Sequence, residues 1–241
     1  MSALFAHLYR RVMRRGRVVG LTALSAVPAL VYPLVVSSAD SVVATDYAAI
    51  VTSTGYTFAI AALIMAGATL REERDSGTLA YIYMRPYSRL RFAMAAIAAG
   101  TAASITLAVI AWGLTVLTGL LVGAGLDITG SGIILFVSAA IGYSAIFVPI
   151  GYLFSRSMLI GLAYVLVVET IVSFVIPGIA QISIWRISMS IYGSFAEFGQ
   201  EALDGLGPIA IGAGGGIVKL GVVLVLGVSL LTWALKKRDA L

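Results

Sequence analysis

The hydrophobic pattern of the chain consists of six long apolar runs separated by short polar breaks. The runs cover residues 18–36, 47–70, 92–121, 132–154, 158–176 and 214–235. An α-helix needs about 20 apolar residues to cross the roughly 30 Å hydrocarbon core of a bilayer, and each run approaches or exceeds this length. The runs are continuous and do not alternate with polar residues, which disfavours a transmembrane strand barrel. We predict an all-α polytopic membrane protein with six transmembrane helices.

The residues before the first run form a predicted amphipathic helix. Within residues 1–17, Leu4, Leu8 and Val12 share one helical face, whereas the arginines lie elsewhere. Such a helix is expected to lie along the membrane interface with its arginines at the lipid headgroups. The alternative is a signal peptide cleaved near the small residues 37–39, but the run 18–36 is longer than the usual signal core of about 7 to 15 residues. We therefore expect an N-terminal interfacial helix.

The segment 177–213 is too polar and too rich in glycine to form a simple span. It still contains large apolar residues, among them Trp185, Ile187 and Ile191. Backbone at membrane depth must be covered by protein or reach water. We therefore expect short outer helices between the fifth and sixth spans that dip into the outer leaflet.

The composition favours a membrane protein without a separate soluble domain. Of the 241 residues, 60% are hydrophobic and 11% are charged, and the mean hydropathy is +1.03. Soluble proteins carry roughly a quarter charged residues. No polar stretch is long enough for a second domain of about 50 residues, so we interpret residues 1–241 as a single transmembrane domain. The absence of cysteine and the single histidine, His7, exclude a disulfide, a thiolate metal site and a histidine cluster.

Basic residues fall almost entirely on one predicted side of the membrane. They occupy the segment before the first span, the loops after the second and fourth spans, and the C-terminus; only Arg186 and Lys219 lie on or near the other side. Because lysine and arginine resist translocation, we place both termini in the cytoplasm and the protein in the plasma (inner) membrane. The net charge of +5 fits basic loops facing anionic lipid better than it fits nucleic-acid binding.

The chain lacks the sequence motifs of several enzyme classes. It contains no G-x-x-x-x-G-K-[ST] phosphate loop, no H-E-x-x-H metal site and no G-x-S-x-G nucleophile turn. We therefore predict that it is not an ATPase, a protease or a lipase. We predict no catalytic residue, and no cofactor or metal in this chain.

The densest polar segment is the predicted cytoplasmic loop 71–89, REERDSGTLAYIYMRPYSR. Gly77 interrupts a charged helix end, and the residues after it form a short amphipathic helix that stops before Pro86. One interpretation is a solvated loop whose arginines only mark the cytoplasmic side. A short amphipathic helix flanked by charges also suits docking into a groove on a cytoplasmic partner.

This loop resembles that of the ABC-2 permeases, the six-helix membrane subunits of one class of ATP-binding-cassette exporters. In that family the loop reads approximately E-R-E-x-G-T-L-E-x-L-L-x-x-P-x-S-R. The matching residues are Glu73, Arg74, Asp75 in place of the second glutamate, Gly77, Thr78, Leu79, Pro86, Ser88 and Arg89. The chain departs from the pattern at Ala80, Ile82 and Tyr83, which suggests an interface tuned to a particular partner. The span count, the orientation, the N-terminal helix and the outer segment resemble the family along the whole chain.

The resemblance implies a permease subunit that exports a lipophilic drug, antibiotic, peptide or lipid, as in multidrug efflux. It also implies two separate ATPase subunits, which would bind ATP and magnesium, and a second permease copy or paralogue as a dimer partner. The matching residues would form a cytoplasmic coupling helix between spans two and three that transmits ATPase movements to the spans. The rival interpretations are an ion-coupled secondary transporter, which typically shows an internal repeat not found here, and a membrane scaffold that transports nothing.

Glu169 is the only carboxylate inside a predicted span. Exposing it to lipid would cost several kcal/mol, so it must face protein or water. An acidic residue in the fifth span is similar to what many ABC-2 permeases carry. Two interpretations stay open: a contact for substrate or a proton on the transport pathway, or a carboxylate that is hydrogen-bonded to a neighbouring helix.

Overall fold

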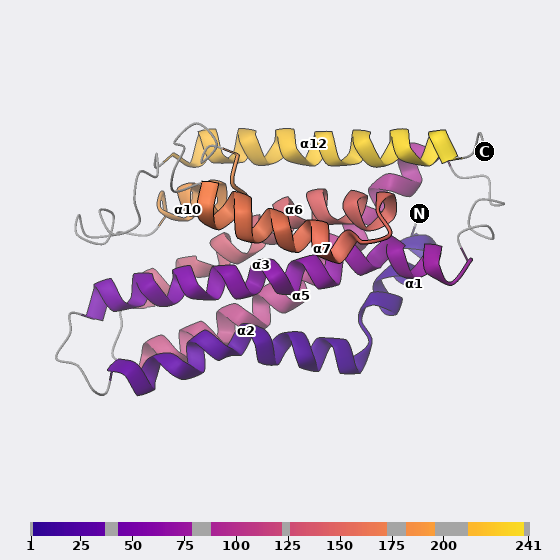
Figure 1. Ribbon diagram of the computed structural model, residues 1–241. Helices are drawn as coiled ribbons and strands as arrows, with labels where there is room; N and C mark the ends of the chain where they lie inside the picture. The colour runs from indigo at the N-terminus through magenta and orange to yellow at the C-terminus, as the bar shows by residue number, and fades with distance from the viewer. Residues whose placement is uncertain are drawn as a thin grey trace.

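The computed structural model describes residues 2–36, 43–78, 88–121, 126–172, 182–195 and 212–238, and helices account for nearly all of them (Figure 1). In chain order these are α1 (Ser2–Val12), α2 (Arg15–Val36), α3 (Val43–Asp75), α5 (Arg89–Leu121), α6 (Leu126–Leu153), α7 (Ser157–Ala163), the π-helix η1 (Tyr164–Val172), α10 (Ile184–Tyr192) and α12 (Ala213–Arg238). None of the described residues forms a strand. The predicted all-α fold is therefore confirmed.

Helices overlap each of the six predicted spans, with α7 and η1 together covering the described part of the fifth, up to Val172. Among the described residues, three helical stretches are long and apolar enough to cross a bilayer, namely Arg89–Thr118, Gly132–Leu153 and Ala213–Lys237. The long helices lie side by side along the length of the bundle (Figure 1). These features are those of a membrane protein, while the six-span topology stays a prediction.

The centre of the bundle lies between α3, α5 and α6, where small residues are combined with a few aromatic rings. Ala59, Ala62 and Ala66 of α3 are fully buried, and Phe58 packs edge-on against Phe136 of α6. Lipid tails are as apolar as leucine, so membrane helices associate through close packing, which small residues allow. The alanine-rich faces of these helices therefore explain how the core forms.

Two glycines of the bundle bring helix backbones into direct contact. A Cβ atom on Gly151 of α6 would overlap the carbonyl oxygen of Gly67 on α3. A Cβ atom on Gly227 of α12 would likewise overlap the carbonyl oxygen of Ala145 on α6. Because any larger side chain would push the backbones apart, α6 packs on α3 and on α12 as closely as it does only through glycine.

The helix α1 is amphipathic as predicted, and the bundle itself covers its apolar face. Leu8 and Val12 are buried in contact with the core, where α1 packs on α3 and α5. The hydroxyl oxygen of Tyr9 lies 3.1 Å from Oγ1 of Thr106 on α5. The hydrophobic pattern thus predicts which face of the helix is buried, but it does not reveal that protein covers this face. The position of α1 at the membrane interface stays a prediction.

The helix α10 lies at the opposite end of the bundle from α1 (Figure 1), within the segment predicted to contain short outer helices. Nearly all its residues are buried, and it packs on α6 and α12. The remaining residues of that segment, 177–181 and 196–211, lie outside the described residues. The same is true of the predicted coupling helix that follows Thr78.

Candidate coupling site

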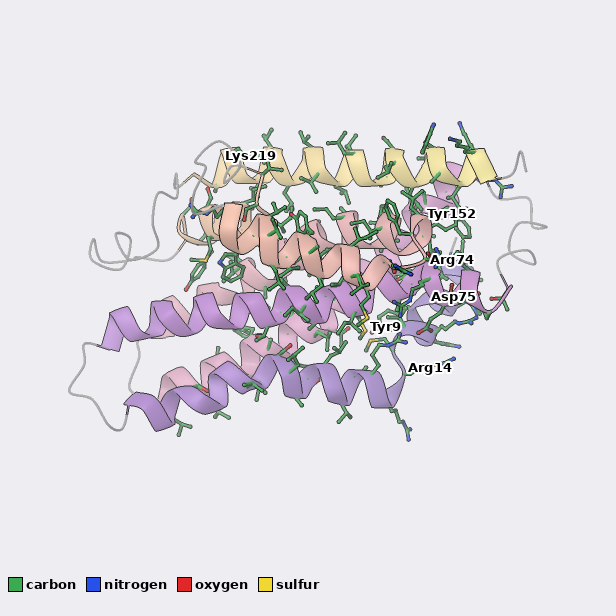
Figure 2. All side chains as sticks on the ribbon, viewed as in Figure 1. Tyr9, Arg14, Arg74, Asp75, Tyr152 and Lys219 are labelled. Atoms are coloured by element: carbon green, nitrogen blue, oxygen red, sulfur yellow. The ribbon has the colours of Figure 1, made fainter. Side chains whose placement is uncertain are left out.

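The predicted coupling residues begin at the C-terminal end of α3, at the same end of the bundle as α1 and as the last turn of α12 (Figure 1). We call residues 71–78 the coupling end. Figure 2 shows Arg14, Arg74, Asp75 and Tyr152 near this end, whereas Lys219 lies toward the other. The structure therefore places α1, the end of α12, Arg14 and Arg74 at the same end of the bundle. That this end faces the cytoplasm stays a prediction.

The helix α3 ends in a turn that depends on Gly77. The amide of Ser76 donates to the carbonyl of Glu72 at 3.1 Å, and the amide of Gly77 donates to the carbonyl of Arg74 at 3.1 Å. Gly77 has a φ of +70°, a left-handed conformation that costs other L-residues about 1 to 2 kcal/mol. Among the described residues, no neighbouring group lies within 4 Å of the place where its Cβ would stand. The backbone conformation is therefore the reason that the turn needs glycine.

Glu73 points into the protein. Its side chain has 0% exposed surface, and Oε1 accepts a hydrogen bond from Nη1 of Arg11 at 2.9 Å. The same oxygen lies 3.0 Å from Nε2 of His7, and the hydroxyl of Thr78 donates to Oε2. A carboxylate can be buried only when it is paired and hydrogen-bonded. The side chains of α1 therefore supply the partners that allow Glu73 to lie inside the protein.

Arg11 holds the end of α3 with both terminal nitrogens of its guanidinium group. Besides its bond to Glu73, it donates through Nη2 to the carbonyl of Glu72 at 3.2 Å and to the hydroxyl of Ser76 at 2.7 Å. Arg17, near the start of α2, pairs with the carboxylate of Glu72. The planar guanidinium can bond several acceptors at once, and its charge is favourable near a helix C-terminus. We call the pairs Arg11–Glu73 and Arg17–Glu72 the N-terminal clamp.

Arg74 connects the coupling end to α6. Its Nη1 donates to the carbonyl oxygen of Tyr152 at 2.9 Å, in the last turn of α6. The last carbonyls of a helix have no partner within the helix, and an arginine can satisfy them. Nε and Nη2 of Arg74 each donate to Oδ1 of Asp75 at 3.1 Å. Asp75 faces outward, with 59% of its side chain exposed.

The other predicted coupling residues lie after the coupling end. Leu79 and Pro86 are outside the described residues, so the structure does not place them. Ser88 precedes α5, and its carbonyl and hydroxyl oxygens accept from first-turn amides of that helix at 3.0 and 3.4 Å. Ser88 therefore has the contacts of a helix N-cap, and Arg89 is the first residue of α5. The other five matched residues lie together at the end of α3.

Several residues that hold the coupling end were not among those predicted from the sequence. They are His7, Arg11, Arg17 and Tyr152. A signal existed for the arginines, because five of them near the N-terminus are complementary in charge to the adjacent acids that end α3. No signal pointed to Tyr152, which contributes a backbone carbonyl that any residue could supply.

The chemistry of the coupling end is that of ion pairs and hydrogen bonds between helices. Across the described ranges, no three His, Cys, Asp or Glu side chains gather as they would to hold a metal ion. Arginine side chains here join the end of α3 to α1, α2 and α6. Such an arrangement can pass a displacement from one helix to the next.

Glu169 lies in η1, and its carboxylate meets the start of α10. Oε1 accepts from the amide of Ile184 at 3.0 Å and from the hydroxyl of Tyr164 at 3.1 Å. Oε2 accepts from the amide of Trp185 at 3.4 Å and from the hydroxyl of Ser183. The side chain is only 2% exposed. Two interpretations of Glu169 were open, a contact for substrate or a proton and a hydrogen bond to a neighbouring helix. The structure contains hydrogen bonds to α10, and the contact with substrate or a proton stays a prediction.

Comparison with known proteins gives one family match. Residues 13–180, more than half of the chain, match the family model described as ABC-2 family transporter protein. No curated protein matches the chain. The matched range contains the coupling end and Glu169, and it ends before α10 and α12.

Proposed function

Since the chain belongs to the ABC-2 family of transporter proteins, we propose that it is the membrane permease of an ATP-binding-cassette exporter. The proposed cargo is lipophilic: a drug, an antibiotic, a peptide or a lipid. The proposed partners are two ATPase subunits, which bind ATP and magnesium, and a second permease copy or paralogue. The proposed location is the plasma (inner) membrane, with both termini in the cytoplasm.

The observation that carries this proposal is the connection of the coupling end to three other helices. Glu73 joins α3 to α1 through Arg11, Glu72 joins α3 to α2 through Arg17, and Arg74 joins α3 to α6 through the carbonyl of Tyr152. A displacement applied at the end of α3 therefore acts on all of these helices at once. A permease that lacks a nucleotide-binding motif needs such a connection, because energy from ATP must enter through contact with a partner.

The contacts divide the matched residues between two proposed roles. Glu73 is fully buried, so it positions α1 and does not touch a partner. Asp75 is largely exposed beside the loop that follows α3, where it can meet a basic group of the ATPase. Exposed charges at the rim of an interface steer association and exclude wrong partners. We therefore assign partner contact to Asp75 and transmission to Glu73 and Arg74.

Association with an ATPase tests the proposal. The permease is co-expressed with its cognate ATPase, purified in lipid nanodiscs and assayed for ATP hydrolysis stimulated by lipophilic compounds. We expect the ATPase to co-purify, and we expect Asp75→Lys to weaken association and stimulated hydrolysis by about tenfold, or about 1.4 kcal/mol. The matched control is Lys219→Glu, which reverses the charge of an exposed residue toward the end of the bundle opposite the coupling end. It should change neither ATPase association nor stimulated hydrolysis.

Four results would contradict the proposal. One is failure of the unsubstituted permease to bind any ATPase, and another is an equal effect of Asp75→Lys and Lys219→Glu. The third is transport by the permease alone in proteoliposomes with an imposed ion gradient, which would favour a secondary transporter. A permease that binds an ATPase but moves no compound under any condition would favour a membrane scaffold.

A further inference from the structure

The buried start of α10 is the feature that carries a further inference. Ile184, at its first turn, packs so closely on Gly142 that a Cβ there would lie 2.6 Å from Cγ2 of Ile184. Gly142 is in the middle of α6, whereas Ile191, near the other end of α10, contacts Gly216 in the first turn of α12. The helix α10 therefore begins deep in the bundle and runs outward. Its first amides lie where water is scarce.

A helix that begins in such a place must find acceptors for its first four amide groups. Two of them belong to Ile184 and Trp185, and both donate to the carboxylate of Glu169. A third, the amide of Arg186, donates to the hydroxyl of the N-cap residue Ser183 at 3.2 Å, and the amide of Ile187 makes the first bond within the helix, to the carbonyl of Ser183 at 3.0 Å. The three amides that follow the N-cap are thus satisfied by side chains, two of them by a residue of η1. The negative charge also lies at the positive end of the helix dipole.

We propose that Glu169 is a positioning residue that fixes α10 to η1 and so sets the place of the outer end of the bundle. In the exporter, α10 then moves together with the fifth span; this last step rests on the proposed function. The hydroxyl of Tyr164, on the same helix as Glu169, donates to Oε1 and orients the carboxylate toward α10. The role requires no contact between Glu169 and the transported molecule.

The pattern of acceptors explains why a carboxylate is needed. Each oxygen of Glu169 accepts from a different backbone amide, and a backbone amide cannot reverse its role. In Glu169→Gln, the side-chain NH2 group would face one of these two amides, whichever way the group is turned. Glutamine therefore breaks the link at one of its two backbone contacts although it preserves the shape. Tyr164→Phe removes only one hydroxyl donor and leaves both backbone contacts in place.

The placement of α10 can be measured by cysteine labelling, because the chain has no cysteine of its own. Ser188 on α10 is fully buried, so Ser188→Cys reports exposure of this helix, while the exposed Ser194 supplies a reference for complete labelling as Ser194→Cys. Purified permease in nanodiscs, without ATPase or substrate, is treated with a water-soluble maleimide. We expect slow labelling of Ser188→Cys in the parent, about tenfold faster labelling with Glu169→Gln, and about twofold faster labelling with Tyr164→Phe. The control Leu166→Ala, at a half-exposed position of η1, should change nothing.

A second substitution tests whether Glu169 links α10 to η1 or only caps the start of α10. Ser183→Asp places a carboxylate on α10 itself, at its N-cap position, and can cap the helix without any contact to η1. Added to Glu169→Gln, it should leave the labelling of Ser188→Cys fast. Return of protection would show that Glu169 only caps α10 and would overturn the proposal.

The proposal would also be overturned if Ser188→Cys were labelled equally slowly by the maleimide in the presence of Glu169 and of Glu169→Gln. If Glu169→Gln then lost substrate-stimulated ATP hydrolysis, the residue would instead be a substrate contact. The labelling is measured without ATPase, so its outcome is independent of the proposed exporter function. Fast labelling in a protein that binds no ATPase would support the link and reject the exporter.

Discussion

The N-terminal clamp gives the sharpest prediction about how the coupling end works. The perturbation is Arg11→Met, which keeps most of the aliphatic stem and removes the charge. Glu73 is 0% exposed and Arg11 is 20% exposed, so the substitution leaves a buried carboxylate with only His7 and Thr78. Removing one partner of a buried ion pair typically costs about 3 to 5 kcal/mol. We expect about 3 kcal/mol, the lower end, because water can reach the pair through the exposed part of Arg11 and through His7.

This cost should appear as undocking of α1. About 3 kcal/mol corresponds to a factor of more than about 100 in the ratio of undocked to docked protein. The burial of Leu4, Leu8 and Val12 still favours the docked state, so the protein should stay folded while α1 opens more often. In a Leu8→Cys background, whose site is fully buried when α1 is docked, the rate of maleimide labelling should therefore rise by about a hundredfold.

Two further variants show whether the buried charge is the cause. Arg10→Met is the matched control, the same change at an exposed neighbouring position, and should leave the labelling rate unchanged. Adding Glu73→Gln to Arg11→Met should recover most of the protection, because no unpaired charge then remains buried. Labelling of Arg11→Met no faster than that of Arg10→Met would refute the reasoning.

Two other predictions concern packing and orientation. Gly151→Ala should destabilise the detergent-solubilised protein by about 1 to 3 kcal/mol, since the new methyl group overlaps the backbone of α3. Gly113→Ala, where no described residue lies within 4 Å of the new Cβ, should be close to neutral, and equal melting curves for the two variants would contradict this. In intact cells, an impermeant maleimide should label Ser194→Cys and spare Ser76→Cys, both at exposed positions, and the reverse pattern would overturn the cytoplasmic placement of the termini.

The sequence predicts the helical elements well because bilayer thickness and helical rise constrain the length of apolar runs. It also singles out Glu73 and Glu169, two carboxylates that the structure buries with hydrogen-bond partners, while their roles in transport stay predictions. The N-terminal helix shows where such prediction ends. Leu8 and Val12 identify its buried face, but an amphipathic pattern is the same whether lipid or protein covers that face.

The motif also could not predict that the side chain of Glu73 points into the protein. A charged residue beside a predicted loop is expected to be exposed, and the family resemblance assigns it to the partner interface. Its pairing with Arg11 joins positions 62 residues apart, and such pairing follows from how the helices assemble. Replacing Glu73 by lysine would therefore disturb α1 first, and any loss of ATPase binding would be a secondary effect. Asp75, two residues later and largely exposed, is the better probe of the proposed ATPase interface.

The contact between Gly67 and Gly151 has a mechanical consequence. Two backbones that already touch can neither approach further nor rotate past one another without first separating, so α3 and α6 form a stiff unit. Arg74 fastens the same two helices at their ends through the carbonyl of Tyr152. A force applied at the coupling end would therefore turn α3 and α6 together as one rigid unit.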